Sequence, residues 1–308
     1  MQLLTVVYII AMCSVLPLFM QSGYYKLGEA KALCYLLMSL CFFVPFIPLL
    51  IKEYKERDLT AKKELSLTYL FFYGTVISSL LSFVFSVDKK TALFGFEGWR
   101  NGLLTYLAML FFCFICTKLR TIPQWGVVAV FIIPAIEFLL GIMDRIGVYL
   151  LPIQGRNSGY LATIGNINWY AGFLAIFVPV GIGFMYSKKA FSREFFIWGV
   201  YVVLGEMALF LQGSDGAVLI VVASFIMLLL FAVSDRQNMK AFLIQLFVLG
   251  LSVTAVGMLT TCFPNSYNYE DNLLLRICQA NIGLIMMAAA FFVYRVVRLF
   301  EEISVDYK

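Results

Sequence analysis

Long apolar runs separated by short polar turns make up most of the chain. Ten runs are long enough to cross about 30 Å of hydrocarbon, some with help from flanking residues. They cover roughly residues 3–20, 32–51, 67–86, 102–117, 125–143, 167–186, 195–211, 217–233, 241–259 and 273–297. Each is predicted to be a helix, because unpaired backbone polar groups are costly in lipid. We therefore expect an all-α integral membrane protein of about ten transmembrane helices, one domain over residues 1–308.

Composition supports this fold class. Hydrophobic residues make up 62% of the 308 residues, charged residues 13%, and the mean hydropathy is +0.91. A soluble domain of this length could not bury so much apolar surface. The net charge of +5 does not indicate nucleic-acid binding, because the basic residues flank the apolar runs.

The distribution of Lys and Arg predicts the orientation in the membrane. Fifteen of the 23 basic residues fall on one side if residues 52–64 are cytoplasmic. With ten spans, both termini are then cytoplasmic, in a multi-pass protein of the plasma membrane. The eight basic residues left on the outer side are Lys26, Lys31, Lys89, Lys90, Arg100, Arg145, Arg156 and Arg276.

Three short polar turns all fall on the predicted outer side. They cover residues 95–102 (G-F-E-G-W-R-N-G), 155–168 (G-R-N-S-G-Y-L-A-T-I-G-N-I-N) and 212–216 (Q-G-S-D-G). Polar groups that converge between the helices of a bundle commonly form a binding site. We therefore expect an outward-facing site that contains arginines.

Arginines in the first two turns are candidates for anion binding. The planar fork of N–H donors on Arg100 matches phosphate or carboxylate. Arg156 precedes a predicted helix start, where free N–H groups and the helix dipole favour an anion. Two structural alternatives stay open. Arg100 could bind a lipid headgroup as an interfacial anchor, and Arg156 could be a surface residue beside a helix capped by Asn166.

Carboxylates provide the remaining chemistry, since the chain has no histidine. Ser214 or Asp215 could cap the helix that follows the third turn, and Asp215 could also act as a base. Glu137 and Glu206 lie inside predicted spans and are expected to face the bundle interior, either as proton-relay groups or as partners in helix-to-helix hydrogen bonds. No metal-binding or cofactor-binding motif is present, so we expect neither a metal nor a cofactor.

The three turns resemble those of the O-antigen ligase and O-antigen polymerase superfamily. The corresponding residues are Gly95 to Arg100-Asn101-Gly102, then Arg156 with Gly165-Asn166-Ile167-Asn168, then Ser214-Asp215-Gly216. The resemblance covers about residues 87–233. It implies a GT-C-like polytopic bundle with short outer loops, in a bacterial cytoplasmic membrane.

The resemblance also implies a function. Family members transfer glycan from polyprenyl diphosphate to a glycan or lipid acceptor, ligating or polymerising it in cell-envelope polysaccharide assembly. By this resemblance, Arg100 and Arg156 would bind the diphosphate without a metal, and Asn166, Asn168 and Ser214 would shape the donor site. The family histidine that acts on the acceptor is missing, so a carboxylate would have to replace it, with Asp215 or Glu97, or else Glu270 or Asp271, as candidates. No nucleic acid is expected as a partner.

The chain also departs from the family pattern. Residues 260–272 form a shorter late loop, the family histidine is missing, and Asp215 stands where the family has arginine. The chain could therefore be a truncated or atypical relative. Two alternatives to a glycosyltransferase follow: a non-catalytic relative or partner subunit that binds polyprenyl-linked glycan, and a polytopic transporter or lipid flippase.

Overall fold

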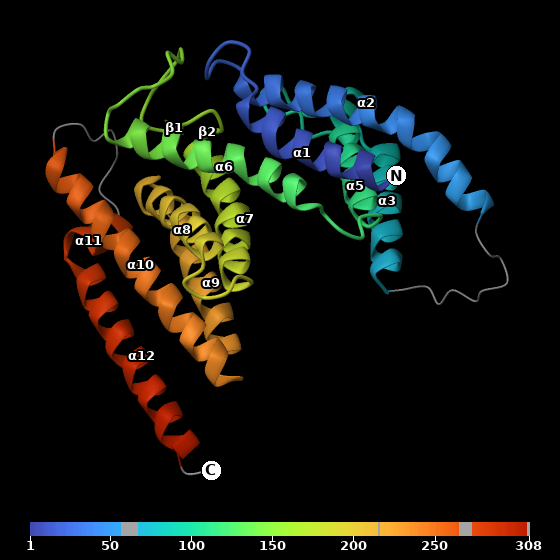
Figure 1. Ribbon diagram of the computed structural model, residues 1–308. Coiled ribbons are helices and arrows are strands. Elements are labelled where there is room, and N and C mark those ends of the chain that lie inside the picture. Colours follow the sequence, from blue (N-terminus) through green and yellow to red (C-terminus); the bar gives the residue numbers. More distant parts are fainter. Residues whose placement is uncertain (57–66, 215, 265–272, 307–308) are drawn as a thin grey trace. The chain divides into compact units, whose positions relative to one another are not determined.

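A computed structural model describes residues 1–56, 67–214, 216–264 and 273–306 (Figure 1). The chain divides into two compact units, unit 1 (Met1–Ile133) and unit 2 (Pro134–Lys308). Helix α6 (Gln124–Arg145) contains the boundary. Each unit is a helical assembly with its own packing, and the single domain expected over residues 1–308 stays a prediction.

Unit 1 consists of apolar helices around an aromatic core. Before α6 it contains α1 (Gln2–Leu18), α2 (Leu27–Lys55), α3 (Leu67–Phe85), α4 (Lys89–Phe94) and α5 (Leu103–Cys116). The ring of Tyr8 stacks on Phe42 at 4.5 Å between centroids and meets Phe112 edge-on at 5.1 Å. The buried Tyr8 hydroxyl donates to Ser39 Oγ at 2.9 Å, so its polar group is satisfied inside the apolar core.

Helices α2 and α5 run parallel within unit 1. At the start of α2, the carboxylate of Glu29 lies 3.3 Å from the guanidinium of Arg100, just before α5. Near the other end of α2, Glu53 lies 2.8 Å from Lys118, just after α5. The two ion pairs therefore lie near opposite ends of α2, and α5 runs in the same direction as α2.

Unit 2 contains the C-terminal part of α6 and six further helices. They are α7 (Ile167–Tyr186), α8 (Arg193–Leu211), α9 (Gly216–Ala232), α10 (Arg236–Cys262), α11 (Leu273–Gln279) and α12 (Ile282–Asp306). A small hairpin of β1 (Tyr160–Leu161) and β2 (Gly165–Asn166) precedes α7. Helices α10 and α12 approach closely at two glycines. A Cβ added to Gly250 would lie only 2.8 Å from the carbonyl oxygen of Gly283. Such small residues let membrane helices pack backbone to backbone.

The helices largely agree with the predicted apolar runs. Seven helices of the described chain are long and apolar enough to cross a membrane, and α1, α5 and the described part of α9 are shorter apolar helices. The last predicted run, 273–297, was wrong as one continuous helix. It breaks between α11 and α12, where Asn281 takes a left-handed conformation with φ of 57°. The polar residues of Gln279-Ala280-Asn281 allow this break, although the run as a whole is apolar.

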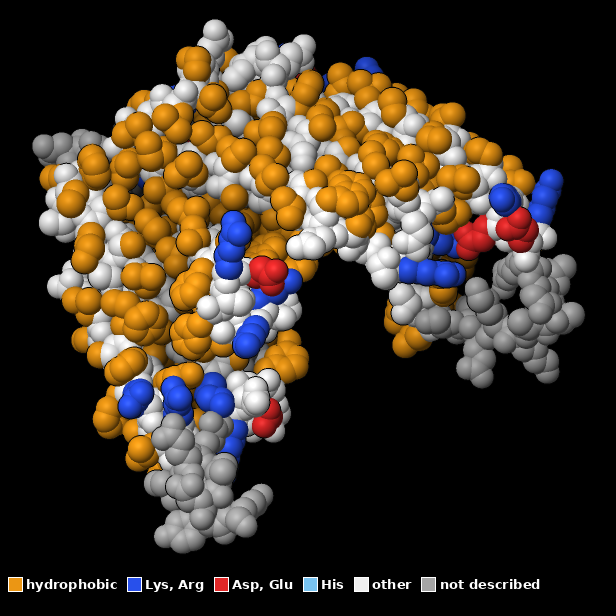
Figure 2. Space-filling view, in the orientation of Figure 1, with side chains coloured by type: hydrophobic (Ala, Val, Ile, Leu, Met, Phe, Trp, Pro, Cys, Tyr) orange, Lys and Arg blue, Asp and Glu red, His pale blue; other side chains and the backbone are white. Residues whose placement is uncertain are grey.

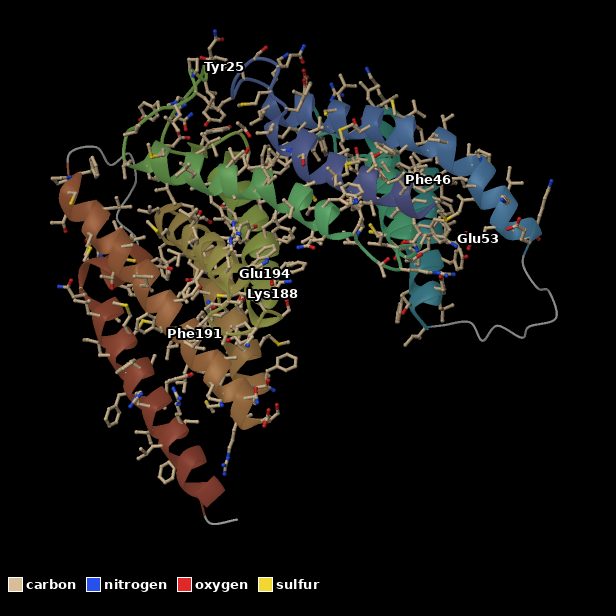
Figure 3. All side chains as sticks on the ribbon, in the orientation of Figure 1. Tyr25, Phe46, Glu53, Lys188, Phe191 and Glu194 are labelled. Carbon is tan, nitrogen blue, oxygen red and sulfur yellow. The ribbon has the colours of Figure 1, made fainter. Side chains whose placement is uncertain are left out.

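Basic residues gather at one end of unit 2. They follow α7, lie near the start of α10 and lie in the C-terminal part of α12, and they are Lys188, Lys189, Arg193, Arg236, Lys240, Arg295 and Arg298. Figure 2 shows Lys and Arg side chains toward the end of α12, and Figure 3 places Lys188 and Glu194 together at the α7–α8 turn. The positive-inside trend predicts that this end is cytoplasmic, and the orientation stays a prediction.

Candidate functional site

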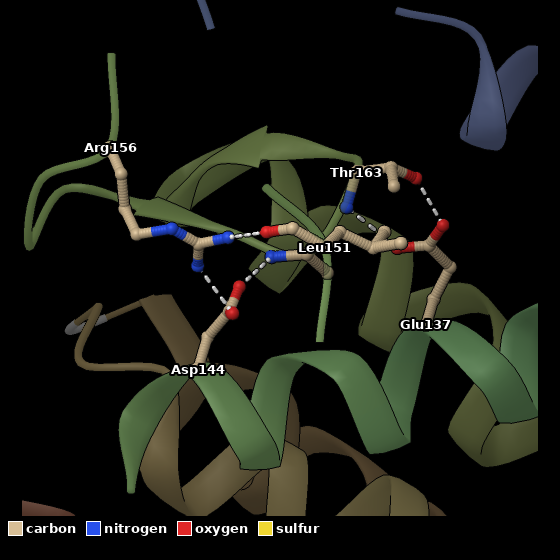
Figure 4. Close-up of polar contacts among 6 residues, drawn as sticks. Glu137, Asp144, Leu151, Arg156 and Thr163 are labelled. Atoms are coloured by element: carbon tan, nitrogen blue, oxygen red, sulfur yellow. Dashed lines mark hydrogen bonds and ion pairs between the residues drawn. The ribbon is translucent and has the colours of Figure 1, made fainter. Parts of the chain in front are cut away.

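Two acids on α6, Glu137 and Asp144, hold the β1–β2 hairpin in place (Figure 4). The hairpin lies at the end of unit 2 opposite the cluster of basic residues. Glu137 and Asp144 are seven residues apart, so they lie on the same face of the helix two turns apart. Glu137 accepts from the hydroxyl of Thr163 and, at 3.1 Å, from its backbone N–H. Asp144 accepts from the backbone N–H of Ala162 at 2.8 Å. These bonds fix the hairpin turn, and Glu137 is fully buried while it does so.

Arg156 binds Asp144, which is the acid of this cluster nearer the C-terminal end of α6. Its Nη1 lies 2.5 Å from Asp144 Oδ1, and its Nη2 donates to the carbonyl of Leu151 at 2.8 Å. The guanidinium also lies over the ring of Tyr149, 4.1 Å from the centroid. An arginine that is planar and held in this way presents its other N–H donors in a fixed direction.

Arg145 joins the second and third polar turns, a role that the sequence did not reveal. Its side chain is buried, and its two terminal nitrogens donate to the carbonyls of Ser158 at 3.0 Å and Gln212 at 2.5 Å. Asp144 binds Arg156, and Arg145 satisfies a carbonyl at the C-terminal end of α8.

Polar residues at the starts of α7 and α9 meet directly. Asn166 caps α7, and its side chain accepts from the backbone N–H of Asn168 at 2.9 Å. Ser214 donates to the side-chain oxygen of Asn168 at 2.6 Å and accepts from Gly216 N–H at 3.2 Å. Two positive helix ends therefore converge at one place. Asp215, the predicted base, lies outside the described residues, as do Glu270 and Asp271.

The first polar turn lies in unit 1. Arg100 has a left-handed backbone (φ 51°) and a side chain that is 40% exposed, paired with Glu29 at 3.3 Å. The N–H of Gly98 donates to the same Glu29 oxygen at 2.9 Å. Glu97 is exposed on this turn. The structure therefore links Asn166, Asn168 and Ser214 by hydrogen bonds at the starts of α7 and α9. Arg156 belongs to the same unit but binds Asp144, and Arg100 and Glu97 lie in unit 1.

Glu206 forms a separate buried contact between α8 and α10. Its two carboxylate oxygens accept from Gln245 at 2.6 Å and from Ser252 at 2.8 Å, and all three side chains are buried. This is the helix-to-helix hydrogen bonding that the sequence allowed. Such bonds stabilise membrane helix packing.

The unit 2 cluster combines two acids with two arginines, namely Glu137 and Asp144 with Arg145 and Arg156. Within the described part of the chain, no three His, Cys, Asp or Glu side chains lie close enough together to hold a metal ion. The polar chemistry available is therefore hydrogen bonding from arginine and helix N-termini, which suits an anionic group.

No protein-family model, curated protein or solved structure matches this chain. The functional interpretation therefore rests on the polar clusters of the two units and on the membrane character of the helices.

Proposed function

We propose that this protein is an outward-facing membrane glycosyltransferase of the O-antigen ligase and polymerase type. It would transfer glycan from polyprenyl diphosphate to a glycan or lipid acceptor in envelope polysaccharide assembly. The proposal includes ten spans in a bacterial plasma membrane and cytoplasmic termini. Its main support is the hydrogen bond between Asn168 and Ser214, which joins the starts of α7 and α9 at the end of unit 2 away from most of its basic residues.

The leaving diphosphate would bind where the helix starts meet. The N–H groups of the first turns of α7 and α9 carry partial positive charge, and Arg156 lies three residues before Gly159, whose carbonyl accepts from Ile167 at the start of α7. The described contacts of Arg156 use two of its five N–H donors. The remaining donors can stabilise charge that develops on the diphosphate.

Transfer itself needs one bond to form and one to break. The acceptor oxygen attacks the anomeric carbon of the donor sugar, and the bond from that carbon to the diphosphate oxygen breaks. The proton of the acceptor hydroxyl goes to a carboxylate, a role that the proposal gives to Asp215, which follows Ser214 directly. The donor site proposed here is built from unit 2 alone, and the predicted roles of Glu97 and Arg100, which lie in unit 1, stay predictions.

Glycan transfer by purified protein in nanodiscs tests this function. The donor is polyprenyl-diphosphate glycan, and the variants are Arg156→Ala, Arg156→Lys and the control Arg193→Ala, an exposed arginine at the other end of unit 2. We expect Arg156→Ala to abolish transfer, Arg156→Lys to restore it in part, and Arg193→Ala to leave it unchanged. Transfer at the wild-type rate by folded Arg156→Ala would refute the role of Arg156.

The same assay separates the two alternatives. Donor binding that Arg156→Ala weakens, without transfer to any acceptor, would instead indicate a non-catalytic relative or a partner subunit. A transporter that relays protons would lose substrate movement in vesicles when Glu137 and Glu206 are replaced by glutamine. The hydrogen bonds that both acids accept favour a structural role for them.

A further inference from the structure

An open pocket in unit 1 lies between the start of α2 and the first polar turn. Its volume is about 600 Å³. The polar lining comes from the turn before α2, where Figure 3 labels the exposed Tyr25, and from Arg100. The apolar lining includes Leu33 and Leu36 of α2 and Leu104 of α5. One wall of the pocket is therefore charged and another is apolar.

The polar wall carries one net positive charge. Lys26 and Arg100 are cationic, and Glu29 is anionic. Lys26 and Arg100 both have left-handed backbones, with φ of 50° and 51°, which is uncommon for residues other than glycine. Backbone conformations of this kind concentrate at functional sites. Both cations of the pocket therefore lie on residues with an uncommon backbone conformation.

Hydrogen bonds hold the Arg100 side of the pocket in place. The backbone N–H of Arg100 donates to the carbonyl of Phe96 at 2.8 Å, and its carbonyl accepts from the hydroxyl of Thr105 at 2.6 Å. Glu29 links the turn to α2 through the N–H of Gly98 at 2.9 Å. The guanidinium, 3.3 Å from Glu29, stays 40% exposed and can contact a ligand in the pocket.

The apolar wall extends along the helix axis. Lys26, Glu29 and Leu33 follow a spacing that keeps them on one face of α2, and Leu36 continues that face. From Lys26 to Leu36 the helix rises about 15 Å, which is about half of the hydrocarbon thickness. A ligand with its polar end at Lys26 and Arg100 would therefore lay an apolar chain against the leucines.

We propose that this pocket binds the headgroup and one acyl chain of an anionic glycerophospholipid. A phosphodiester carries one negative charge, which matches the single net positive charge of the wall. The diphosphate of a polyprenyl donor carries more negative charge than this wall neutralises, and free phosphate would leave the apolar wall uncovered. The site would therefore be a lipid site in addition to the proposed donor site in unit 2.

Lipid binding to the purified full chain tests the site. The probes are phosphatidylglycerol in nanodiscs, polyprenyl diphosphate and inorganic phosphate, measured by native mass spectrometry and by competition with labelled phosphatidylglycerol. The test variant is Lys26→Gln with Arg100→Gln, which removes both charges and keeps most of each stem. The control is Lys90→Gln on α4, outside the pocket lining.

We expect the double variant to lose phosphatidylglycerol affinity by about tenfold or more, because charge-assisted bonds to phosphate are the stronger ones. Glu29→Gln should raise the affinity, since it removes the opposing charge. The control should bind like the wild type, and inorganic phosphate should not compete.

Three results would overturn the site. The first is unchanged phosphatidylglycerol binding by the double variant with wild-type circular dichroism and melting behaviour. The second is displacement of the lipid by inorganic phosphate. The third is preference for polyprenyl diphosphate, lost in the double variant, which would assign Arg100 to the donor. Glycan transfer is measured separately with Arg156→Ala, so failure of either proposal leaves the other standing.

Discussion

Arg100 and Arg156 were predicted to share one role, yet their surroundings differ. Arg156 is 18% exposed and lies 2.5 Å from an aspartate that is 7% exposed, with Tyr149 covering its guanidinium. Arg100 is 40% exposed, lies 3.3 Å from Glu29, and lines an open pocket. The same residue type thus closes a loop in one unit and faces an accessible hollow in the other.

The difference shows how a paired carboxylate changes what an arginine can do. Asp144 also accepts a hydrogen bond from the backbone N–H of Ala162, so its carboxylate is held in place and orients Arg156. Glu29 also accepts from Gly98, but its partner arginine keeps a large exposed surface. Breaking the first pair should cost stability and also misplace Arg156 for the proposed donor, whereas breaking the second should cost little stability and mainly change ligand binding.

The largest effect is expected from Asp144→Ala. It leaves Arg156 and the N–H of Ala162 without their shared partner, and removing one member of a buried pair costs about 3 kcal/mol or more. The matched substitution Glu29→Ala should cost less than about 1 kcal/mol, because its pair is more exposed. Reversible unfolding in a detergent titration measures both. Equal losses would mean that the two pairs do not differ as described.

A second test targets the rigid wall of the open pocket. A Cβ on Gly102 would overlap the backbone of Leu93 and Gly95. We expect Gly102→Ala to cost about 2 kcal/mol through overpacking, and to weaken phosphatidylglycerol binding. Gly74→Ala in α3, where nothing lies within 4 Å of the added carbon, is the control. Wild-type melting and lipid affinity of Gly102→Ala would show that the wall is not held rigidly.

Ser214→Ala probes the convergence of α7 and α9. The substitution removes the bond to Asn168 and the acceptor for Gly216, and we expect a loss of about 1 kcal/mol from these polar contacts. Donor binding should fall with it, because the helix starts lose their alignment. Ser187→Ala, at the far end of α7, is the control, since its hydroxyl donates within the last turn of that helix. Unchanged donor affinity in Ser214→Ala would count against the site in unit 2.

The smallest effect is expected at Asp88, the cap of α4. The hydroxyl of Thr91 and two backbone N–H groups donate to Asp88 and hold its pKa below the ordinary value of 3.8. A lowered pKa in the folded state stabilises the fold above pH 3.8, and this contribution is lost as the pH falls toward the folded pKa. Asp88→Asn should flatten this acid-side slope in melting temperature. If the melting temperature of Asp88→Asn falls with pH as steeply as that of the wild type, Asp88 does not contribute to the loss of stability in acid.

The sequence predicted the helices better than the contacts between turns. Apolar runs predicted most helices, whereas the ion pairs of Glu29 with Arg100 and of Glu53 with Lys118 in unit 1 became known only from the structure. Apolar runs and loop charge could not decide the partner of Asp144. Neighbouring helix residues point about 100° apart, so Arg145 faces Gln212 while Asp144 faces the loop.

Lys26 is the site residue that sequence reasoning passed over. It looked like one more basic residue flanking a span, and its left-handed backbone has no signature in residue type. The helix break at Asn281 was missed for a related reason. Hydropathy averaged over a long apolar run hides a short polar segment within it. The orientation in the membrane and the predicted roles of Asp215 and Glu97 stay predictions.

The two bonds of Arg145 couple the loop before α7 to the end of α8. Because one guanidinium donates to both Ser158 and Gln212, neither backbone segment can shift without straining the other. A ligand that orders one turn would then lower the opening rate of the other, and amide hydrogen exchange would slow at both. The turns would respond as one cooperative element, with binding energy at either shared between them.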